Sequence, residues 1–233
     1  MFWQERDDDK FELGDEVQDV IFELQGKMVP VDHAYALSRE LVKHLPWFKD
    51  DPHSGLHHIH IAASGNGWQR PDADRDGTMY LSRRTRLILR LPKARIEEAV
   101  AALEGVELDI DGCPLTLGKA KTRPLSTLTT LFSRYVIADS LDDEEAFMQH
   151  VVAQLRDLDV RVRKLLCGKS GVLKTPDGDI QVRSVMLADL DVDESVRLQQ
   201  LGIGPGRHLG CGLFIPHKGI DAVSAKQSDG KSD

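Results

Sequence analysis

The amino-acid sequence predicts an α+β protein made of two successive units with the same order of elements. Segments with alternating apolar residues, typical of strands, take turns with segments whose apolar residues recur every three or four positions, typical of helices. The order strand–helix–strand–strand–helix–strand can be followed twice along the 233 residues. This length suits one large or two small domains, and 41% apolar residues are enough to form their cores.

The first unit opens with a strand over residues 17–26, where apolar residues alternate. A helix over 31–45 follows, with Asp32 as its expected N-cap and Pro46 as its stop. The remaining elements expected in this unit are strands in 55–64 and 79–92, a helix in 94–105, and a hairpin over 106–118 that turns at Asp111-Gly112.

The second unit repeats this order. Its expected elements are strands in 130–139, 160–168, 179–190 and 209–216, with helices in 143–158 and 193–202. Asp193 is the expected cap of the last helix. Each unit therefore has the β-α-β-β-α-β order of a ferredoxin-like (RRM-like) domain, a sheet type that often binds single-stranded or looped RNA. We expect domains at 1–122 and 123–219, and a disordered polar tail at 220–233.

The net charge of −8 argues, taken alone, against a nucleic-acid partner. The charges are unevenly distributed, however, because residues 81–95, 117–136 and 160–174 carry several basic side chains and no acidic one. Such stretches can be ordinary solvated faces, but several of them together favour an anionic ligand.

The protein is expected to be cytoplasmic. No apolar run is long enough for a membrane helix, and the acidic N-terminus lacks an apolar signal core. The three cysteines are far apart and form no C-x-x-C pair, which is typical of a reduced protein.

A glycine-rich segment over residues 201–218 is the most distinctive motif. It is not a dinucleotide fingerprint, because Arg207 stands where the third glycine is required. It is not a P-loop either, because Gly168-Lys169-Ser170 is preceded five residues earlier by Arg163 and not by glycine. The spacing found here is Gly202-Ile203-Gly204, five residues, then Gly210-Cys211-Gly212.

With this spacing, the sequence resembles the CRISPR-associated endoribonucleases that cut precursor CRISPR RNA (the Cas-six family), in particular their MYXAN-type variant. The family loop reads G-φ-G, five residues, G-φ-G, where φ is apolar, and here Cys211 takes the second apolar place. The segments VDHAYAL and GLHHIHI are also similar, and the resemblance covers residues 17–220. It implies metal-independent cleavage of repeat RNA by attack of a ribose 2′-hydroxyl, which leaves a 2′,3′-cyclic phosphate and a 5′-hydroxyl.

Such chemistry needs a base, an acid and groups that stabilise a charged phosphorane. Histidine suits the proton transfers because it titrates near neutral pH. The resemblance indicates His57 and His33 as catalytic candidates, each with a structural role as the alternative. Tyr35 is a weaker candidate that donates to a phosphate or lies half-buried in the core.

No metal or other cofactor is expected. The histidines between His53 and His60 lack a fixed cysteine or carboxylate partner for zinc. Residues 72–77 resemble the start of a calcium loop, but its twelfth position is Arg83 and not glutamate.

RNA contacts are expected at two places. Arg84, Arg86 and Arg90 alternate with leucines on one strand and form a basic stripe. In the glycine-rich segment, main-chain N–H groups at Gly202, Gly204, Gly210 and Gly212, with Arg207 and Lys218, are expected to hold an RNA backbone. The alternatives are a solvated edge strand and a tight loop packed between the domains.

The expected partners are CRISPR repeat RNA, as precursor and as mature crRNA, and other Cas subunits of an effector complex. Two other functions stay open at this point. One is a crRNA-binding subunit that lacks catalysis, and the other is a metabolic protein that binds a small phosphorylated ligand.

Overall fold

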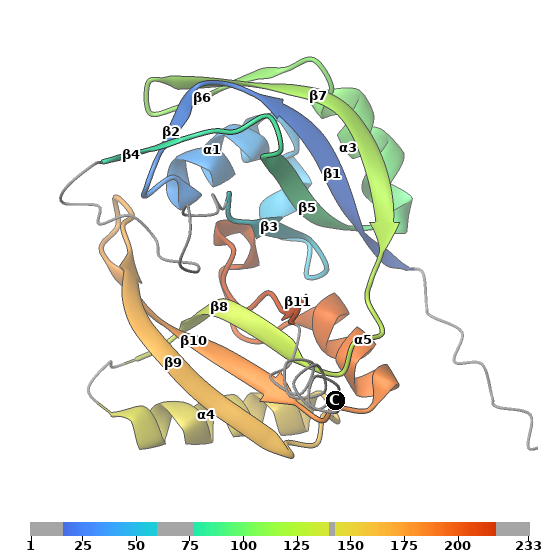
Figure 1. Ribbon diagram of the computed structural model, residues 1–233, viewed down its shortest axis with the longest axis vertical. Helices are drawn as coiled ribbons and strands as arrows, with labels where there is room; N and C mark the ends of the chain where they lie inside the picture. The colour runs from blue at the N-terminus through green and yellow to red at the C-terminus, as the bar shows by residue number, and fades with distance from the viewer. Residues whose placement is uncertain (1–15, 60–76, 140–142, 218–233) are drawn as a thin grey trace, which may run out of the picture.

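The computed structural model describes residues 16–59, 77–139 and 143–217, which form two domains stacked along the long axis of the molecule (Figure 1). The first domain contains β1 (Val17–Gln25), β2 (Met28–Pro30), α1 (Ala34–His44), β3 (Gly55–His57), β4 (Thr78–Tyr80), β5 (Arg86–Pro92), α3 (Ile96–Leu103), β6 (Glu107–Ile110) and β7 (Cys113–Pro124), with short 3-10 helices η1 (Pro46–Lys49) and η2 (Lys93–Arg95). The second contains β8 (Leu131–Ile137), α4 (Glu144–Asp157), β9 (Lys164–Leu173), β10 (Ile180–Ala188), α5 (Val192–Leu201), η3 (Arg207–Leu209) and β11 (Ile215–Pro216).

The first domain is an antiparallel five-stranded sheet in the order β3-β5-β1-β7-β6, and β2 pairs with β4 beside it. The β6–β7 hairpin turns at Asp111 and Gly112, whose φ angles of 50° and 84° are those of the tight turn that the sequence predicted. Pro124 ends the last long strand of this sheet, and β8 begins the second sheet at Leu131.

The second sheet has the order β11-β8-β10-β9, so its strands stand in the order fourth, first, third, second. Its element order along the chain is β-α-β-β-α-β. The first domain follows the same order with β2, β4 and β6 as additions. The predicted α+β class is therefore confirmed.

Each domain has its own apolar core, and a third cluster joins the two. Phe22, Leu37 and Leu89 are fully buried in the first core, and Val151 and Val185 in the second. The joining cluster combines Ala34 of α1 with residues of the second domain, namely Tyr135, Leu173, Val182, Leu209 and Cys211. The glycine-rich segment thus lies between the two domains, as Figure 1 shows at η3.

Several local predictions were wrong. The strand expected over 79–92 is two strands, because Ser82–Thr85 form a turn closed by Thr85 N–H donating to Ser82 O at 3.0 Å. Helix α1 starts at Ala34 and its N-cap is His33, so Asp32 does not cap it. Helix α5 is capped by Asp191 and Glu194, which form a capping box, and not by Asp193. The last strand is limited to Ile215–Pro216.

Candidate functional site

The carboxylate of Asp19 is the centre of a charged cluster on the first sheet. Asp19 lies on β1, directly opposite Arg90 of β5 and Arg123 of β7. Arg90 Nε donates to Asp19 Oδ1 at 2.9 Å, and Arg123 Nη2 donates to Oδ2 at 3.0 Å. His57 Nε2, at the end of β3, lies 3.3 Å from Asp19 Oδ1. Cross-strand register therefore brings an acid, a histidine and two arginines to one place.

Burial and charge set the protonation states in this cluster. Burial alone would raise the pKa of Asp19, but the positive charge of Arg90 and the contact with His57 outweigh it and hold that pKa well below 3.8. Burial lowers the pKa of His57, and the Asp19 carboxylate only partly offsets this. At neutral pH the cluster therefore holds an ionised carboxylate beside a neutral imidazole.

Arg90 has no exposed surface, and its guanidinium spans the domain boundary. Besides Asp19, it reaches the second domain, where Nη1 donates to Gln199 O and to Phe214 O, each at 2.8 Å. The predicted RNA contact at Arg90 needs correction, because in this structure the side chain lies beneath the second domain and cannot reach a phosphate.

Arg207 makes the reciprocal connection from the second domain to the first. Its Nε donates to Ser54 O at 3.1 Å, and Nη2 donates to His53 O at 3.1 Å and to Gln200 O at 3.0 Å. Burial, with a smaller effect from Arg90, lowers the pKa of Arg207 to about 9, which still leaves it charged at neutral pH. The side chain is 8% exposed, so it fastens the two domains and does not face an open surface.

The glycines of the loop are required by close approach of main chains. Gly202 and Gly212 have φ of 64° and 65°, and a Cβ on either would collide with backbone of the other G-φ-G element. A Cβ on Gly210 would collide with the imidazole of His58. Gly204 differs, because it is exposed and a Cβ there meets only the side chain of Gln154.

Most loop amides that were expected to hold phosphate donate to protein carbonyls. Gly202 N–H donates to Leu198 O, Gly210 N–H to Arg207 O, and Gly212 N–H to Tyr135 O at 2.7 Å. Because these N–H groups already donate to protein carbonyls, the arrangement favours the alternative stated above, a tight loop packed between the domains. Among the expected loop positions that the structure describes, only Gly204 is exposed, and Lys218 lies outside the described residues.

A second group of titratable side chains lies where α1, β3 and β8 meet. His58 Nε2 is 2.8 Å from Leu209 O, and its ring centroid lies 4.5 Å from that of Tyr135 and 5.7 Å from that of His33. His33 is buried; Nδ1 lies 2.9 Å from Pro30 O, and Nε2 accepts the N–H of Ile59 at 3.0 Å. His33 therefore carries its proton on Nδ1 and ties the end of β3 to the start of α1.

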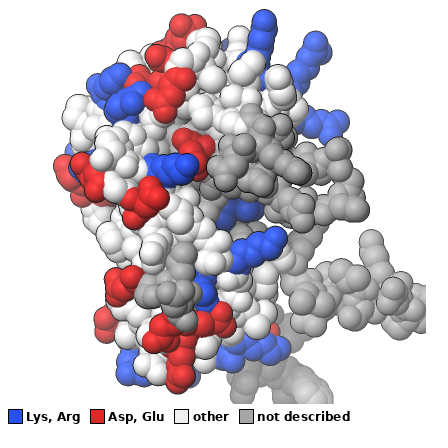
Figure 2. All heavy atoms as spheres, turned by 90° about the vertical axis from the view of Figure 1, so that its left-hand side faces the viewer, with Lys and Arg blue, Asp and Glu red and all other residues white. Residues whose placement is uncertain are grey.

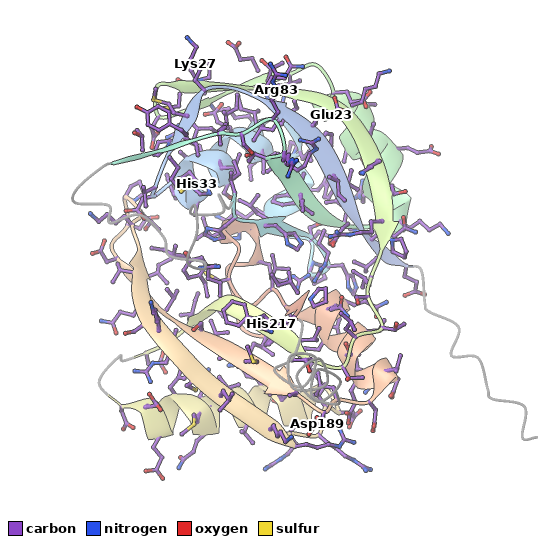
Figure 3. The ribbon with its side chains drawn as sticks, viewed as in Figure 1. Glu23, Lys27, His33, Arg83, Asp189 and His217 are labelled. Atoms are coloured by element: carbon purple, nitrogen blue, oxygen red, sulfur yellow. The ribbon has the colours of Figure 1, made fainter. Side chains whose placement is uncertain are left out.

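The other predicted site residues lie on α1, in the turn before β5 and at the start of β5. Tyr35 is half-buried against the apolar cluster that joins the domains. Arg84 is exposed in the turn before β5, next to Arg83, and Arg86 Nη1 donates to the carbonyls of Arg83 and Thr85. Figure 3 places Arg83 and Lys27 at the outer end of the first domain, whereas His33 lies on the side of that domain nearer the second.

The surface charge is mixed. On the face in Figure 2, acidic and basic side chains are interspersed, and several basic ones lie at mid-height, where the domains meet. Over residues 16–59, 77–139 and 143–217, no three His, Cys, Asp or Glu side chains gather in a way that could hold a metal ion. Among the helices of the same ranges, none is long and apolar enough to cross a membrane.

Comparison with known proteins assigns the chain to a family. The family model described as "Cas6 Crispr" matches residues 18–219. The chain belongs to the Cas6 family. A relative from Myxococcus xanthus (strain DK1622), named "CRISPR-associated endonuclease Cas6", is 32% identical over 201 residues, which are 85% of this chain and 80% of the relative.

Solved structures agree with this Cas6 assignment at the level of fold. A "CRISPR associated protein Cas6" has a TM-score of 0.60 at 15% identity and covers 87% of this chain and 100% of its own. A Cas6-related protein from Pyrococcus furiosus has a TM-score of 0.60 at 16% identity, covering 85% of this chain and 97% of its own. An "RAMP protein binding different RNA substrates" also has a TM-score of 0.60, at 16% identity, over 86% of this chain and 100% of its own.

Sequence reasoning missed four side chains of the site in this Cas6 chain: Asp19, His58, Arg123 and Tyr135. Asp19 had a signal, because an acid inside an apolar strand is unusual unless it is paired. His58 lies in the GLHHIHI segment, and Arg123 and Tyr135 lie in the acid-free stretch 117–136. Their contacts could not be predicted, because these depend on strand register and on the packing of one domain against the other.

Proposed function

We propose that this protein is an endoribonuclease that cuts the repeat RNA of precursor CRISPR transcripts. The observation that carries the proposal is membership in the Cas6 family over residues 18–219, together with a relative named as an endonuclease. The two β-α-β-β-α-β units support it, because in this proposal they are tandem ferredoxin-like domains, a kind often used to bind RNA. We divide them between β7 and β8, after Pro124, in place of the expected division at 122/123. The protein works in the cytoplasm, alone or with other Cas subunits.

The proposed reaction needs no metal. The 2′-oxygen of the ribose before the scissile phosphate loses its proton to a base and attacks the phosphorus. The bond from phosphorus to the 5′-oxygen breaks, and an acid protonates that oxygen. The products are a 2′,3′-cyclic phosphate and a 5′-hydroxyl. The reaction consumes no water, because the 2′-oxygen takes the place of the 5′-oxygen on phosphorus. The protein supplies proton transfer and positive charge.

His57 is our candidate for the base. Its lowered pKa keeps the imidazole neutral at pH 7, and the Asp19 carboxylate lies 3.3 Å from Nε2, where it can orient the ring and stabilise the protonated form. Arg123, whose side chain is 53% exposed and pairs with Asp19, is our candidate cation for the phosphorane. His33 and Tyr35 remain the further candidates; the backbone bonds of His33 fit a positioning role for the end of β3.

A specific observation favours the second candidate function, a crRNA-binding subunit without catalysis. Both ring nitrogens of His33 face backbone groups, and His57 is largely buried, so catalysis at either requires the RNA to gain access. In that case the chain keeps the fold and the RNA surface but cuts nothing.

One assay separates the two. Purified protein is mixed with end-labelled repeat RNA in excess EDTA, with a repeat whose 2′-hydroxyl is removed at the cleavage site as the control. We expect cutting of the intact repeat, a 2′,3′-cyclic phosphate on the upstream product, and binding without cutting of the control. Binding of both RNAs with no cutting would identify the non-catalytic subunit, and cutting only after Mg²⁺ is added would contradict the metal-independent chemistry.

A further inference from the structure

The face of the second sheet opposite its helices carries an apolar row that crosses all four strands. Phe132 of β8 pairs with Met186 of β10 and with Ile215 of β11, and Met186 pairs with Leu166 of β9. Directly paired residues of antiparallel strands point to the same face, so these four side chains lie side by side. The adjacent residue Leu187 points to the opposite face, into the core with Val151 of α4.

The row is open, whereas the part of this side of the sheet that lies toward the glycine-rich segment is covered. Toward the glycine-rich segment, Val182 and Tyr135 are buried beneath Ala34 and Leu209. In the row, Leu166 is 60% exposed, and Phe132, Met186 and Ile215 are half-buried. An apolar row left exposed next to covered surface is typical of a binding site.

Two rings and a cation stand together at one end of the row. The ring centroids of Phe132 and His217 are 6.0 Å apart with planes tilted by 52°, and the guanidinium carbon of Arg134 lies 6.0 Å from the Phe132 centroid. His217 is exposed at the end of β11, and Figure 3 shows it beside β8 on the side of the second domain that is nearer the first. Over the described residues, Arg134 enters no ion pair, so its charge is available to an anion.

This combination suits a nucleotide better than a protein segment. A flat aromatic ring on a four-stranded sheet of this topology stacks on a nucleobase, whatever the base, and a nearby guanidinium can bind the phosphate that follows. An apolar protein surface would leave the charge of Arg134 uncompensated. Phe132 also lies on the first strand of the β-α-β-β-α-β unit, in the middle of the sheet.

We propose that Phe132, with His217 and Arg134, forms a stacking site for one unpaired nucleotide of the RNA, separate from the His57–Asp19 cluster. The proposal rests on the proposed function for the identity of the RNA, but not on cleavage. The apolar row is the floor of the site, and the second domain thus holds a single-stranded part of the substrate while the cluster on the first sheet acts on another part.

The test measures binding of repeat RNA whose cleavage-site 2′-hydroxyl is removed, so cutting plays no part. Phe132→Leu keeps an apolar side chain but removes the ring, Phe132→Trp restores a ring, and Tyr80→Leu removes a ring that is 72% exposed in the first domain and serves as the matched control. A set of RNAs, each with one abasic unpaired nucleotide, locates the contact.

We expect Phe132→Leu to weaken binding of the intact RNA about tenfold. We expect Phe132→Trp and Tyr80→Leu to bind like the wild type, and the effect of Phe132→Leu to disappear on one particular abasic RNA. Equal affinity of Phe132→Leu and wild type on every RNA would overturn the proposal, as would an equal loss on every abasic RNA. Because the readout is binding, wild-type protein that binds but does not cut would contradict the proposed function and leave this result interpretable.

Discussion

Arg90 Nε donates to Asp19 Oδ1 at 2.9 Å in a place where neither side chain meets water appreciably. The same guanidinium donates to two carbonyls of the second domain, so one ion pair both neutralises a buried acid and fastens two domains. Arg207 fastens them from the other side through Ser54 and His53. The glycine spacing of the family loop permits this close contact between the two domains.

Replacing Arg90 tests the ion pair as a structural element. Arg90→Ala leaves the Asp19 carboxylate in a buried place without its main partner, so we expect a loss of about 3–5 kcal/mol in the free energy of unfolding. Urea denaturation followed by circular dichroism measures it. Arg95→Ala, which removes an exposed ion pair with Glu98, is the matched control and should change stability little. Equal effects of the two variants would contradict the role given to Arg90.

The pKa of Asp19 gives this ion pair a pH dependence. Because this pKa lies below 3.8 in the folded protein, the unfolded chain takes up a proton first as the pH falls. The stabilisation is therefore fully present above about pH 4 and is lost as the pH falls through the folded-state pKa. We expect the stability of the wild type to fall more steeply in acid than that of Asp19→Asn, measured by urea denaturation between about pH 5 and pH 2. Parallel curves would show that Asp19 does not titrate with folding.

Two glycines of the loop provide a matched pair. Gly204 and Gly212 have φ of 66° and 65°, so alanine carries the same backbone strain at both, on the order of 1–2 kcal/mol. Only at Gly212 does the new Cβ collide with the carbonyl of Ile203. We expect Gly212→Ala to lower the melting temperature much more than Gly204→Ala, because backbone cannot move aside as a side chain can. A larger loss for Gly204→Ala would contradict this account.

Much of the fold could be predicted from local patterns, since β1, β8, α4 and the Asp111-Gly112 turn carry clear alternation, helical spacing or turn residues. Less of the site could be predicted in this way. Alternation on β5 separated Leu87, Leu89 and Leu91 correctly from Arg90, but it cannot show that the second domain covers the arginine face. The loop spacing indicated the family, whereas the reason for the glycines depends on contacts between Gly202, Gly212 and residues that only folding brings near.

Arg84 and Arg86 of the predicted basic stripe have different roles. Arg84 is exposed, and its guanidinium has no partner within the described ranges. The guanidinium of Arg86, in contrast, donates to carbonyls of the turn that precedes it. We expect Arg84→Ala to weaken RNA binding and to reduce the slope of log K against log salt by about 0.7–1. Arg86→Ala should lower thermal stability and leave the slope nearly unchanged. An unchanged slope in Arg84→Ala would remove this residue from the RNA interface.

The proposed base predicts where activity declines in acid. Burial lowers the pKa of His57 below 6.5, so the neutral imidazole persists to a lower pH than in a free histidine. We expect the single-turnover cleavage rate to fall only below pH 6.5. A rate that already declines above that pH would indicate a different base, and the same profile measured in Asp19→Asn shows whether the carboxylate sets its position.

The most direct test of the central claim is the single-turnover cleavage rate of His57→Gln on repeat RNA, with binding measured on the same preparation. His150→Gln, at an exposed position on α4, is the control. The account predicts a loss of at least about 100-fold in rate for His57→Gln with unchanged affinity, and normal rates for the control. A folded His57→Gln protein that binds and cuts like the wild type would contradict it.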